Sequence, residues 1–285
     1  MLALTSVSAA DAWRGTSHQD QVAWKEVWSD SFTGPKGTGV NKRFWKYDTR
    51  RGIFGTGEAE TMTSSPGNVE LHGMGDLSIN AIKNAGSWTS GRIQTISTFA
   101  PPAGGEMMVT ASIKQPDPGD GLGYWPAFWL LGPGTWPENG EIDIMEDVDA
   151  LSLHSGTLHC GNLTQDGDGT TGPCHEPTGI TSGLKPCAKC QTGYHTYSVI
   201  VDRRRADNQQ IRWYLDGQQF FAVNEQQVGT AVRTQAVDHG LSIVFDLAIG
   251  GSYPDSRCGC VAPGSQTTSG GTMSVHRVAI YDSAQ

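Results

Sequence analysis

The feature of this sequence that most constrains its fold is a succession of short β-type segments, separated by turn residues, that runs from Trp24 to Tyr281. The segments are rich in β-branched and aromatic residues, and Gly, Pro, Asn and Asp mark the intervals. Only residues 226–236 have a helix-like composition, and Gly229 weakens it. Closely spaced strands without intervening helices are typical of two-sheet folds. We therefore expect an all-β fold, a two-sheet antiparallel β-sandwich or jelly roll.

Alternation of apolar and polar residues supports several of these strands. In 107–113 the odd positions are apolar, while Thr110 and Ser112 face the other way. Asp216-Gly217 stands between two apolar runs and predicts a tight hairpin. The expected strands are 24–32, 58–63, 76–82, 91–99, 106–114, 124–131, 141–148, 156–160, 195–201, 210–215, 241–249 and 273–281.

Composition and charge narrow the possible partners. The chain has 37 Gly and 14 Pro but only 17% charged residues, which leaves few residues for long surface helices. Its net charge of −9 argues against nucleic acid or an anionic membrane as a partner. No apolar run approaches the roughly 20 residues of a membrane-spanning helix. We expect a monomer, with residues 24–285 as a single β-sandwich domain and residues 1–23 as a mobile arm or a signal-peptide remnant.

Six cysteines lie in loop-like stretches, and their even number favours disulfides and a secreted protein. Cys160 and Cys174 flank one loop, so we expect them to pair; the other pairings stay open. Cys187-x-x-Cys190 with His175 or His195 is an alternative zinc site. The second C-x-x-C of a typical zinc site is missing, which favours a disulfide.

The segment 141–148 places acidic residues inside a run of strand composition. Glu141, Asp143 and Glu146 stand among isoleucine, methionine and valine. In a regular strand Glu146 would point to the opposite face from the other two acids, whereas one β-bulge would return it to the same face. Two carboxyl groups about 5–5.5 Å apart are what a retaining glycosidase needs, one as nucleophile and one as acid/base. The alternatives are a solvated strand face or a calcium site, although calcium loops usually contain Gly and Asn.

The runs WPAFWLL (125–131), Trp136-Pro137 and GEIDIME (140–146) closely resemble the signature of glycoside hydrolase family 16, in its laminarinase-like group. Further similar segments follow in order along the chain: SGRIQT (90–95), GTLH (156–159), YHTY (194–197), IRWYLDGQQF (211–220), LAIGG (247–251) and VHRVAIY (275–281).

The resemblance implies a concanavalin-like jelly roll with an open cleft on its concave sheet, and a β-glucan polysaccharide as substrate. By position, Glu141 corresponds to the nucleophile, Asp143 to the assisting carboxylate and Glu146 to the acid/base. The expected activity is that of a secreted, retaining endo-β-1,3-glucanase. A mixed-linkage glucanase, a galactan hydrolase and a non-catalytic lectin on the same fold remain as alternatives.

Substrate-binding residues are also implied by the resemblance. They are Trp129, Trp136, His159, Arg92, Trp125 and Tyr253, where Tyr253 replaces a more usual tryptophan. Aromatic rings stack on sugar faces; the alternatives are core packing for the tryptophans, a structural role for His159 and a sheet ion pair for Arg92. Asp246 stands where Asn is usual. We expect no cofactor, because Ser31 and His276 replace the side-chain ligands of the calcium found in many relatives.

Overall fold

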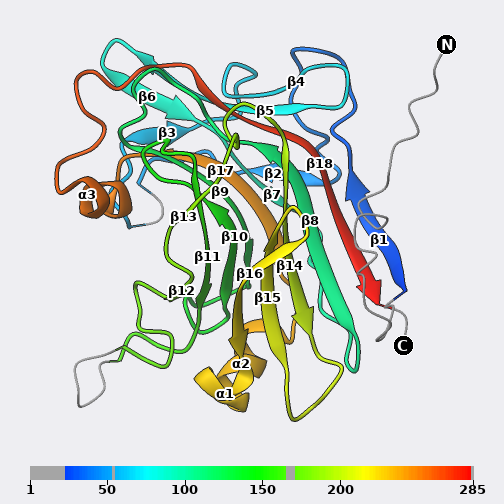
Figure 1. Cartoon of the computed structure of the whole chain (residues 1–285). Coiled ribbons are helices and arrows are strands. Elements are labelled where there is room, and N and C mark those ends of the chain that lie inside the picture. Colours follow the sequence, from blue (N-terminus) through cyan, green and yellow to red (C-terminus); the bar gives the residue numbers. More distant parts are fainter. Residues whose placement is uncertain (1–22, 53–54, 165–170, 284–285) are drawn as a thin grey trace.

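Two β-sheets pack face to face across one hydrophobic core, which confirms the expected all-β sandwich (Figure 1). The computed structural model describes residues 23–52, 55–164 and 171–283. The arm expected over residues 1–23 therefore lies outside the described residues, except for Ala23. Among the described helices, none has the length and hydrophobicity needed to cross a membrane.

The larger sheet has ten strands in the order β16-β15-β14-β8-β18-β5-β6-β3, with β1 paired to β18 and β4 paired to β5. All of its pairings are antiparallel except that of β3 with β6. The strands are β1 (Trp24–Asp30), β3 (Glu60–Met62), β4 (Val69–Leu71), β5 (Leu77–Asn84), β6 (Ser87–Ser90), β8 (Glu106–Lys114), β14 (His195–Asp202), β15 (Gln210–Leu215), β16 (Gln218–Asn224) and β18 (Gly271–Ser283).

The second sheet has eight strands in the order β12-β11-β10-β9-β17-β7-β2, with β13 paired to β11. They are β2 (Trp45–Tyr47), β7 (Arg92–Thr95), β9 (Tyr124–Leu131), β10 (Glu141–Glu146), β11 (Leu153–His159), β12 (Ile180–Thr181), β13 (Lys185–Pro186) and β17 (Ser242–Ile249). β10, which carries the acidic residues, lies between β9 and β11, so neighbouring strands support it on both sides.

Every strand expected from the sequence is present, with ends that differ by a few residues. The hairpin at Asp216-Gly217 joins β15 to β16, and both residues have positive φ, 49° and 76°. The helix-like run is divided at Gly229 into α1 (Glu225–Val228) and α2 (Thr230–Val237). A third helix, α3 (Ser252–Cys258), was not expected.

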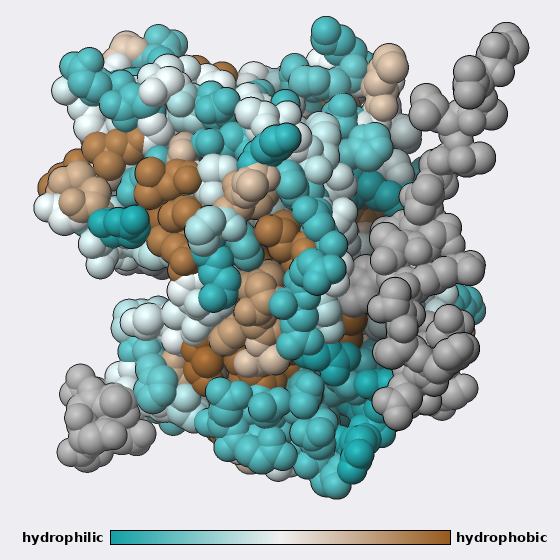
Figure 2. Space-filling view, in the orientation of Figure 1, coloured by the Kyte–Doolittle hydropathy of each residue, from teal (hydrophilic) through white to brown (hydrophobic). Residues whose placement is uncertain are grey.

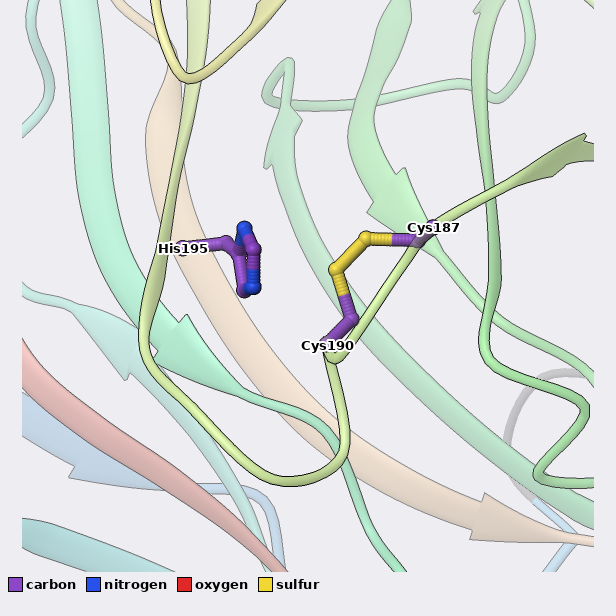
Figure 3. Close-up of side chains that lie close together, drawn as sticks. All are labelled: Cys187, Cys190 and His195. Carbon is purple, nitrogen blue, oxygen red and sulfur yellow. A yellow bond between two sulfur atoms is a disulfide. The ribbon is translucent and has the colours of Figure 1, made fainter.

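All six cysteines form disulfides, Cys160–Cys174, Cys187–Cys190 and Cys258–Cys260. The first confirms the expected pair. The sulfurs of Cys187 and Cys190 are joined to each other, and the His195 ring lies beside them (Figure 3).

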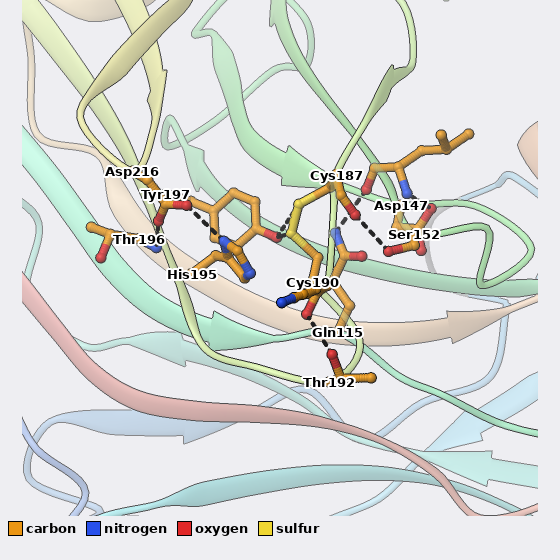
Figure 4. The surroundings of a disulfide bond; sticks show 12 residues. Gln115, Asp147, Ser152, Cys187, Cys190, Thr192, His195, Thr196, Tyr197 and Asp216 are labelled. Carbon is orange, nitrogen blue, oxygen red and sulfur yellow. Dashed lines mark hydrogen bonds and ion pairs between the residues drawn. A yellow bond between two sulfur atoms is a disulfide. The ribbon is translucent and has the colours of Figure 1, made fainter.

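His195 and Tyr197 have structural partners around this bond. The Nδ1 atom of His195 lies 2.6 Å from Oδ2 of Asp216 in the hairpin, and the buried hydroxyl of Tyr197 lies 2.9 Å from Sγ of Cys190 (Figure 4). The disulfide therefore closes the 187–190 turn, which contacts the start of β14 through Tyr197, and neither cysteine lines the cleft described below.

Candidate active site

A β-bulge in β10 brings the three acidic residues to one surface. Between Asp143 and Glu146, β10 carries Ile144 and Met145 where β11 has only Gly156. The register with β9 shifts in the same place. Both Ile144 and Met145 point into the core and are fully buried, so the carboxyl groups on either side of them face the same way.

The opposite sheet holds this bulge from behind. The indole nitrogen of Trp213, on β15, donates a hydrogen bond of 2.7 Å to the main-chain oxygen of Asp143. A buried carbonyl that loses its partner at a bulge is costly, so this bond stabilises the distortion. Gly156 makes the close approach possible, because a Cβ atom there would lie 2.5 Å from Cδ1 of Trp213.

The three acids line a cavity of about 520 Å³ on the outer face of the second sheet. Most of the other lining residues come from β7, β9 and β17 and from segments beside them: Gly55, Thr56, Glu58, Arg92, Trp125, Ala127, Trp129, Leu131, Trp136, Pro177, Asp246 and Ala248. A second cavity of about 420 Å³ shares Leu131 and Trp136 and is also lined by Lys46 and Gln94. In the space-filling view, apolar side chains collect in the indented left-hand part of the molecule, while hydrophilic ones cover the lower margin around α1 and α2 (Figure 2).

Glu146 is held so that it keeps a proton at neutral pH. Burial, reinforced by the charge of Asp143, raises the pKa of Glu146 from 4.5 to about 8. Within the described part of the chain, its side-chain hydrogen-bond donor is the uncharged indole N–H of Trp125, 2.9 Å from Oε1. A carboxylic acid that is protonated at pH 7 can donate a proton to a leaving oxygen.

Glu141 and Asp143 share a histidine. The Nε2 atom of His159 lies 3.7 Å from Oε1 of Glu141 and 3.4 Å from Oδ2 of Asp143. Burial and the negative charge of Asp143 raise the pKa of Glu141 well above its usual value, while His159 and Arg92 act in the opposite direction. These positive charges offset part of the shift, but the net pKa stays raised, so Glu141 can act as a nucleophile only when the protons of the acid cluster reside on its neighbours.

His159 is in turn oriented by Glu176. Burial lowers the pKa of His159, but its hydrogen bonds to Asp143 and Glu176 outweigh this, and the pKa lies well above its usual value. Nδ1 lies 2.7 Å from Oε2 of Glu176, whose other oxygen accepts a bond of 3.0 Å from the Cys160 N–H. Because Cys160 is bonded to Cys174, the disulfide holds the strand end of His159 close to the segment that carries Glu176.

Arg92 and Trp129 form a layer next to the acids. The guanidinium carbon of Arg92 lies 4.6 Å from the centre of the Trp129 ring, and its Nε is 3.4 Å from Oδ2 of Asp48. The indole N–H of Trp129 donates to Asp246 at 2.7 Å. Burial raises the pKa of Asp246 to about 6. Both Arg92 and Trp129 are largely buried and line the cavity along one side.

The other aromatic residues expected to bind substrate, Trp136, Trp125 and Tyr253, differ in how they lie relative to the cavity. Trp136 is 37% exposed, lines both cavities and has its ring centre 5.5 Å from that of His159. Trp125 lines the first cavity. Tyr253 meets Trp125 edge-on, with ring centres 5.4 Å apart, and is not among the lining residues. The structure therefore places Tyr253 beside the cleft wall, where it supports Trp125.

Glu141, Asp143 and His159 are also close enough to share a metal ion, since their ligand atoms lie within 4.8 Å of one another. The hydrogen bonds of His159 to Asp143 and Glu176 raise its pKa well above the usual value, so a cation at this cluster would have to displace the proton that these contacts favour.

Sequence reasoning missed Glu176, Asp48 and Glu58 as site residues. Asp48 and Glu176 lie in loop-like stretches and Glu58 stands at the first position of the expected strand 58–63, and only the three-dimensional pairing of distant segments brings them to the site. One available signal was the expected pairing of Cys160 with Cys174, which implies that the residues after Cys174 return towards His159.

Comparison with known proteins identifies the family of this chain. Residues 67–209 match the sequence profile described as the XgeA-like, catalytic GH16 domain. The chain belongs to glycoside hydrolase family 16. A crystal structure of an endo-1,3-β-glucanase from Streptomyces sioyaensis superposes with a TM-score of 0.84 at 37% identity, covering 95% of this chain and 100% of that one. The resemblance noted in the sequence is therefore confirmed.

This chain covers different shares of the length of two relatives. A protein from Niallia circulans named glucan endo-1,3-β-glucosidase A1 is 31% identical over 258 residues, which is 81% of this chain but only 34% of the relative. A β-glucanase from Rhodothermus marinus is 27% identical over 269 residues, 88% of this chain and 84% of the relative. The chain thus spans about a third of the length of the first of these relatives.

Proposed function

We propose that this glycoside hydrolase is an endo-acting β-1,3-glucanase that cleaves its substrate with net retention at the anomeric carbon. The observation that carries the proposal is the bulge in β10, which sets Glu141, Asp143 and Glu146 on one face of an open cleft. The substrate class is supported by the Streptomyces sioyaensis enzyme, which is named an endo-1,3-β-glucanase and is matched along its whole length.

In the first step the ionised Glu141 attacks the anomeric carbon of the scissile linkage. The C–O bond to the departing sugar breaks as the carboxylate forms the new bond, and Glu146 gives its proton to the departing oxygen. In the second step Glu146, now ionised, removes a proton from water, and the water oxygen replaces Glu141 at the same carbon. Two displacements from opposite faces restore the original β configuration.

Asp143 and His159 distribute charge during these steps. Asp143 lies between the two glutamates in the strand, and its negative charge raises the pKa of both. A protonated His159 beside Glu141 and Asp143 compensates part of this charge. The histidine lowers the pKa of Glu141 and so favours the distribution that the mechanism requires, in which Glu141 is ionised and Glu146 holds the proton.

The aromatic residues would bind the sugar chain. Trp136, partly exposed at the junction of the two cavities, offers a ring face on which a pyranose can stack, and Trp125 offers a second surface beside Glu146. Arg92 and Trp129 are buried and would shape the floor of the cleft, with His159 orienting the acids.

We further propose that the protein is secreted, acts as a monomer and needs no cofactor or structural calcium. The three disulfides support an oxidising compartment. At the two positions where relatives have calcium ligands, the Ser31 hydroxyl accepts a hydrogen bond from Nη1 of Arg277 at 3.4 Å, and Nδ1 of His276 lies 2.9 Å from Oδ1 of Asp76. These contacts use the polar groups that an ion would otherwise occupy.

The test of the mechanism is proton NMR of the products formed from a soluble β-1,3-glucan in the first minutes of reaction. We expect the β-anomer first, followed by slow mutarotation. Initial release of the α-anomer would contradict a double displacement. Parallel reducing-sugar assays on laminarin, curdlan, barley glucan and agarose establish the linkage, and activity only on barley glucan or only on agarose would replace β-1,3-glucan as the substrate.

A further inference from the structure

Glu58 contributes a carboxyl group to the cleft that the hydrolytic mechanism does not use. It is 9% exposed, precedes β3 and lines the same cavity as the three acids. Its Oε1 atom accepts a hydrogen bond from the Thr56 hydroxyl. Its Oε2 atom is buried and has no hydrogen-bond partner within the described residues. A buried acceptor of this kind is costly unless a ligand completes it.

The segment that carries Glu58 is anchored to the end of β17. The Ala59 N–H donates to the Ile249 oxygen at 2.7 Å, and the Ile249 N–H donates to Oε2 of Glu60 at 2.9 Å. The Ser252 N–H donates to the Thr56 oxygen, also at 2.7 Å. These bonds on both sides of Glu58 hold its backbone in place, so the position of the carboxyl group is built into the fold.

Glu58 lies well away from the cleavage point. The strands β10, β9 and β17 are neighbours, and the segment of Glu58 follows on the far side of β17. Three neighbouring positions at about 4.8 Å each give roughly 14 Å between this segment and β10. A sugar unit that contacts Glu58 is therefore not the unit that Glu141 attacks.

Charge determines what kind of sugar this position can accept. The cavity lining contains five acidic side chains, Glu58, Glu141, Asp143, Glu146 and Asp246, against the single basic residue Arg92. Arg92 is already paired with Asp48 and stacked on Trp129. An uncharged hydroxyl group can donate to Oε2 of Glu58, whereas a sulfate or carboxylate on the sugar would meet like charge in a poorly solvated site.

We propose that Glu58 determines specificity by accepting a hydrogen bond from a hydroxyl group of a neutral glucosyl unit, remote from the cleavage point, and by excluding sulfated or carboxylated chains. This inference rests on the proposed β-1,3-glucanase activity. Glu58, on the far side of β17, would then strengthen the binding of long, uncharged substrates, whereas short substrates would not reach it.

The experiment compares wild type with Glu58→Ala and Glu58→Gln on neutral β-1,3-linked oligosaccharides of increasing length and on a carboxymethylated β-1,3-glucan. For Glu58→Ala we expect kcat/KM to fall about tenfold on the longest oligosaccharides, the size of one lost hydrogen bond to a charged group, and to stay unchanged on the shortest ones cleaved. For Glu58→Gln, the preference for the neutral over the carboxymethylated polymer should fall at least about fivefold. Glu70→Gln, on β4 of the other sheet, is the matched control.

An equal loss at all substrate lengths, or no loss, overturns the role of Glu58, as does an unchanged preference in Glu58→Gln. Urea unfolding of each variant separates misfolding from lost recognition, and Glu58→Gln keeps the volume of the side chain if the alanine variant does not fold. Wild-type protein that cleaves none of the neutral substrates would instead refute the proposed activity, and the inference with it.

Discussion

Replacing Glu146 with glutamine should stabilise the protein, and should do so increasingly as the pH rises. The pKa of Glu146 is raised from 4.5 to about 8, first by burial and then by the charge of Asp143. Between these two values the folded state binds more protons than the unfolded state, so wild-type stability falls as the pH rises through this window. Glutamine does not titrate, yet its carbonyl can still accept the hydrogen bond of Trp125.

The magnitude follows from the size of the shift. At 1.36 kcal/mol per pKa unit, a carboxyl group shifted from 4.5 to about 8 destabilises the folded state by about 3 kcal/mol at pH 7 and by about 1 kcal/mol at pH 5. Water in the open cleft screens part of this difference. We therefore expect Glu146→Gln to gain about 1–2 kcal/mol over wild type between pH 5 and pH 7.

Urea unfolding at pH 5, 6 and 7, with both proteins measured in the same buffers, tests this expectation. Glu138→Gln, in the loop between β9 and β10, serves as the control for loss of one carboxyl group. A difference between Glu146→Gln and wild type that does not change with pH would refute the reasoning, since it would mean that Glu146 titrates alike in the folded and unfolded states. If the stability gain of Glu146→Gln over wild type instead became smaller as the pH rose, the pKa of Glu146 would be lower in the folded state than in the unfolded state.

Three further predictions concern the surroundings of the acids. Trp213→Phe removes the indole donor to the Asp143 carbonyl, so the free energy of unfolding in urea should fall by about 1–3 kcal/mol and kcat should also fall. Trp88→Phe, a buried position on β6, is the control, and a loss of stability no larger than in this control would contradict a role of Trp213 in the bulge. Glu176→Gln keeps the shape of the side chain but removes its negative charge, which lowers the pKa of His159. Glu141 then becomes harder to ionise, so the acidic limb of the pH–rate profile should shift to higher pH. An acidic limb at the same pH as in wild type would contradict this. A chelator should leave the melting temperature unchanged within about 1 °C, and a drop of several degrees would reveal a bound ion.

The fold and the central acids could be predicted because their signals are local. Alternation and turn residues identify the long strands, and the three-residue step from Asp143 to Glu146 requires a bulge if all three acids are to share a face. The strands β2, β4 and β6 were missed because three or four residues are too few to show alternation. The helix α3 was missed because its composition, with Pro254 in the first turn, is that of a loop.

The residues that support the acids could not be predicted, because their positions depend on contacts between distant segments. Glu176 reaches His159 through a disulfide-closed loop, and Glu58 reaches the cleft because its segment is bonded to the end of β17. Glu176 stands in a loop-like stretch and Glu58 at the first position of the expected strand 58–63, and neither local sequence marks its glutamate as a site residue. What distinguishes them is burial, which only the folded chain provides.

The choice of hydrogen-bond donors around the acids explains how buried carboxyl groups keep a useful proton. Glu146 and Asp246 each accept from a tryptophan indole, and so does the main-chain oxygen of Asp143. An indole N–H positions an acceptor without bringing a positive charge, whereas an arginine in the same place would favour the ionised form and depress the pKa. Arg92, a guanidinium that also lines the cavity, is paired with Asp48 and lies over the Trp129 ring. Tryptophans therefore serve here as neutral supports, because the indole of Trp125 holds Glu146 in place and leaves its pKa raised, as the proposed acid/base role requires.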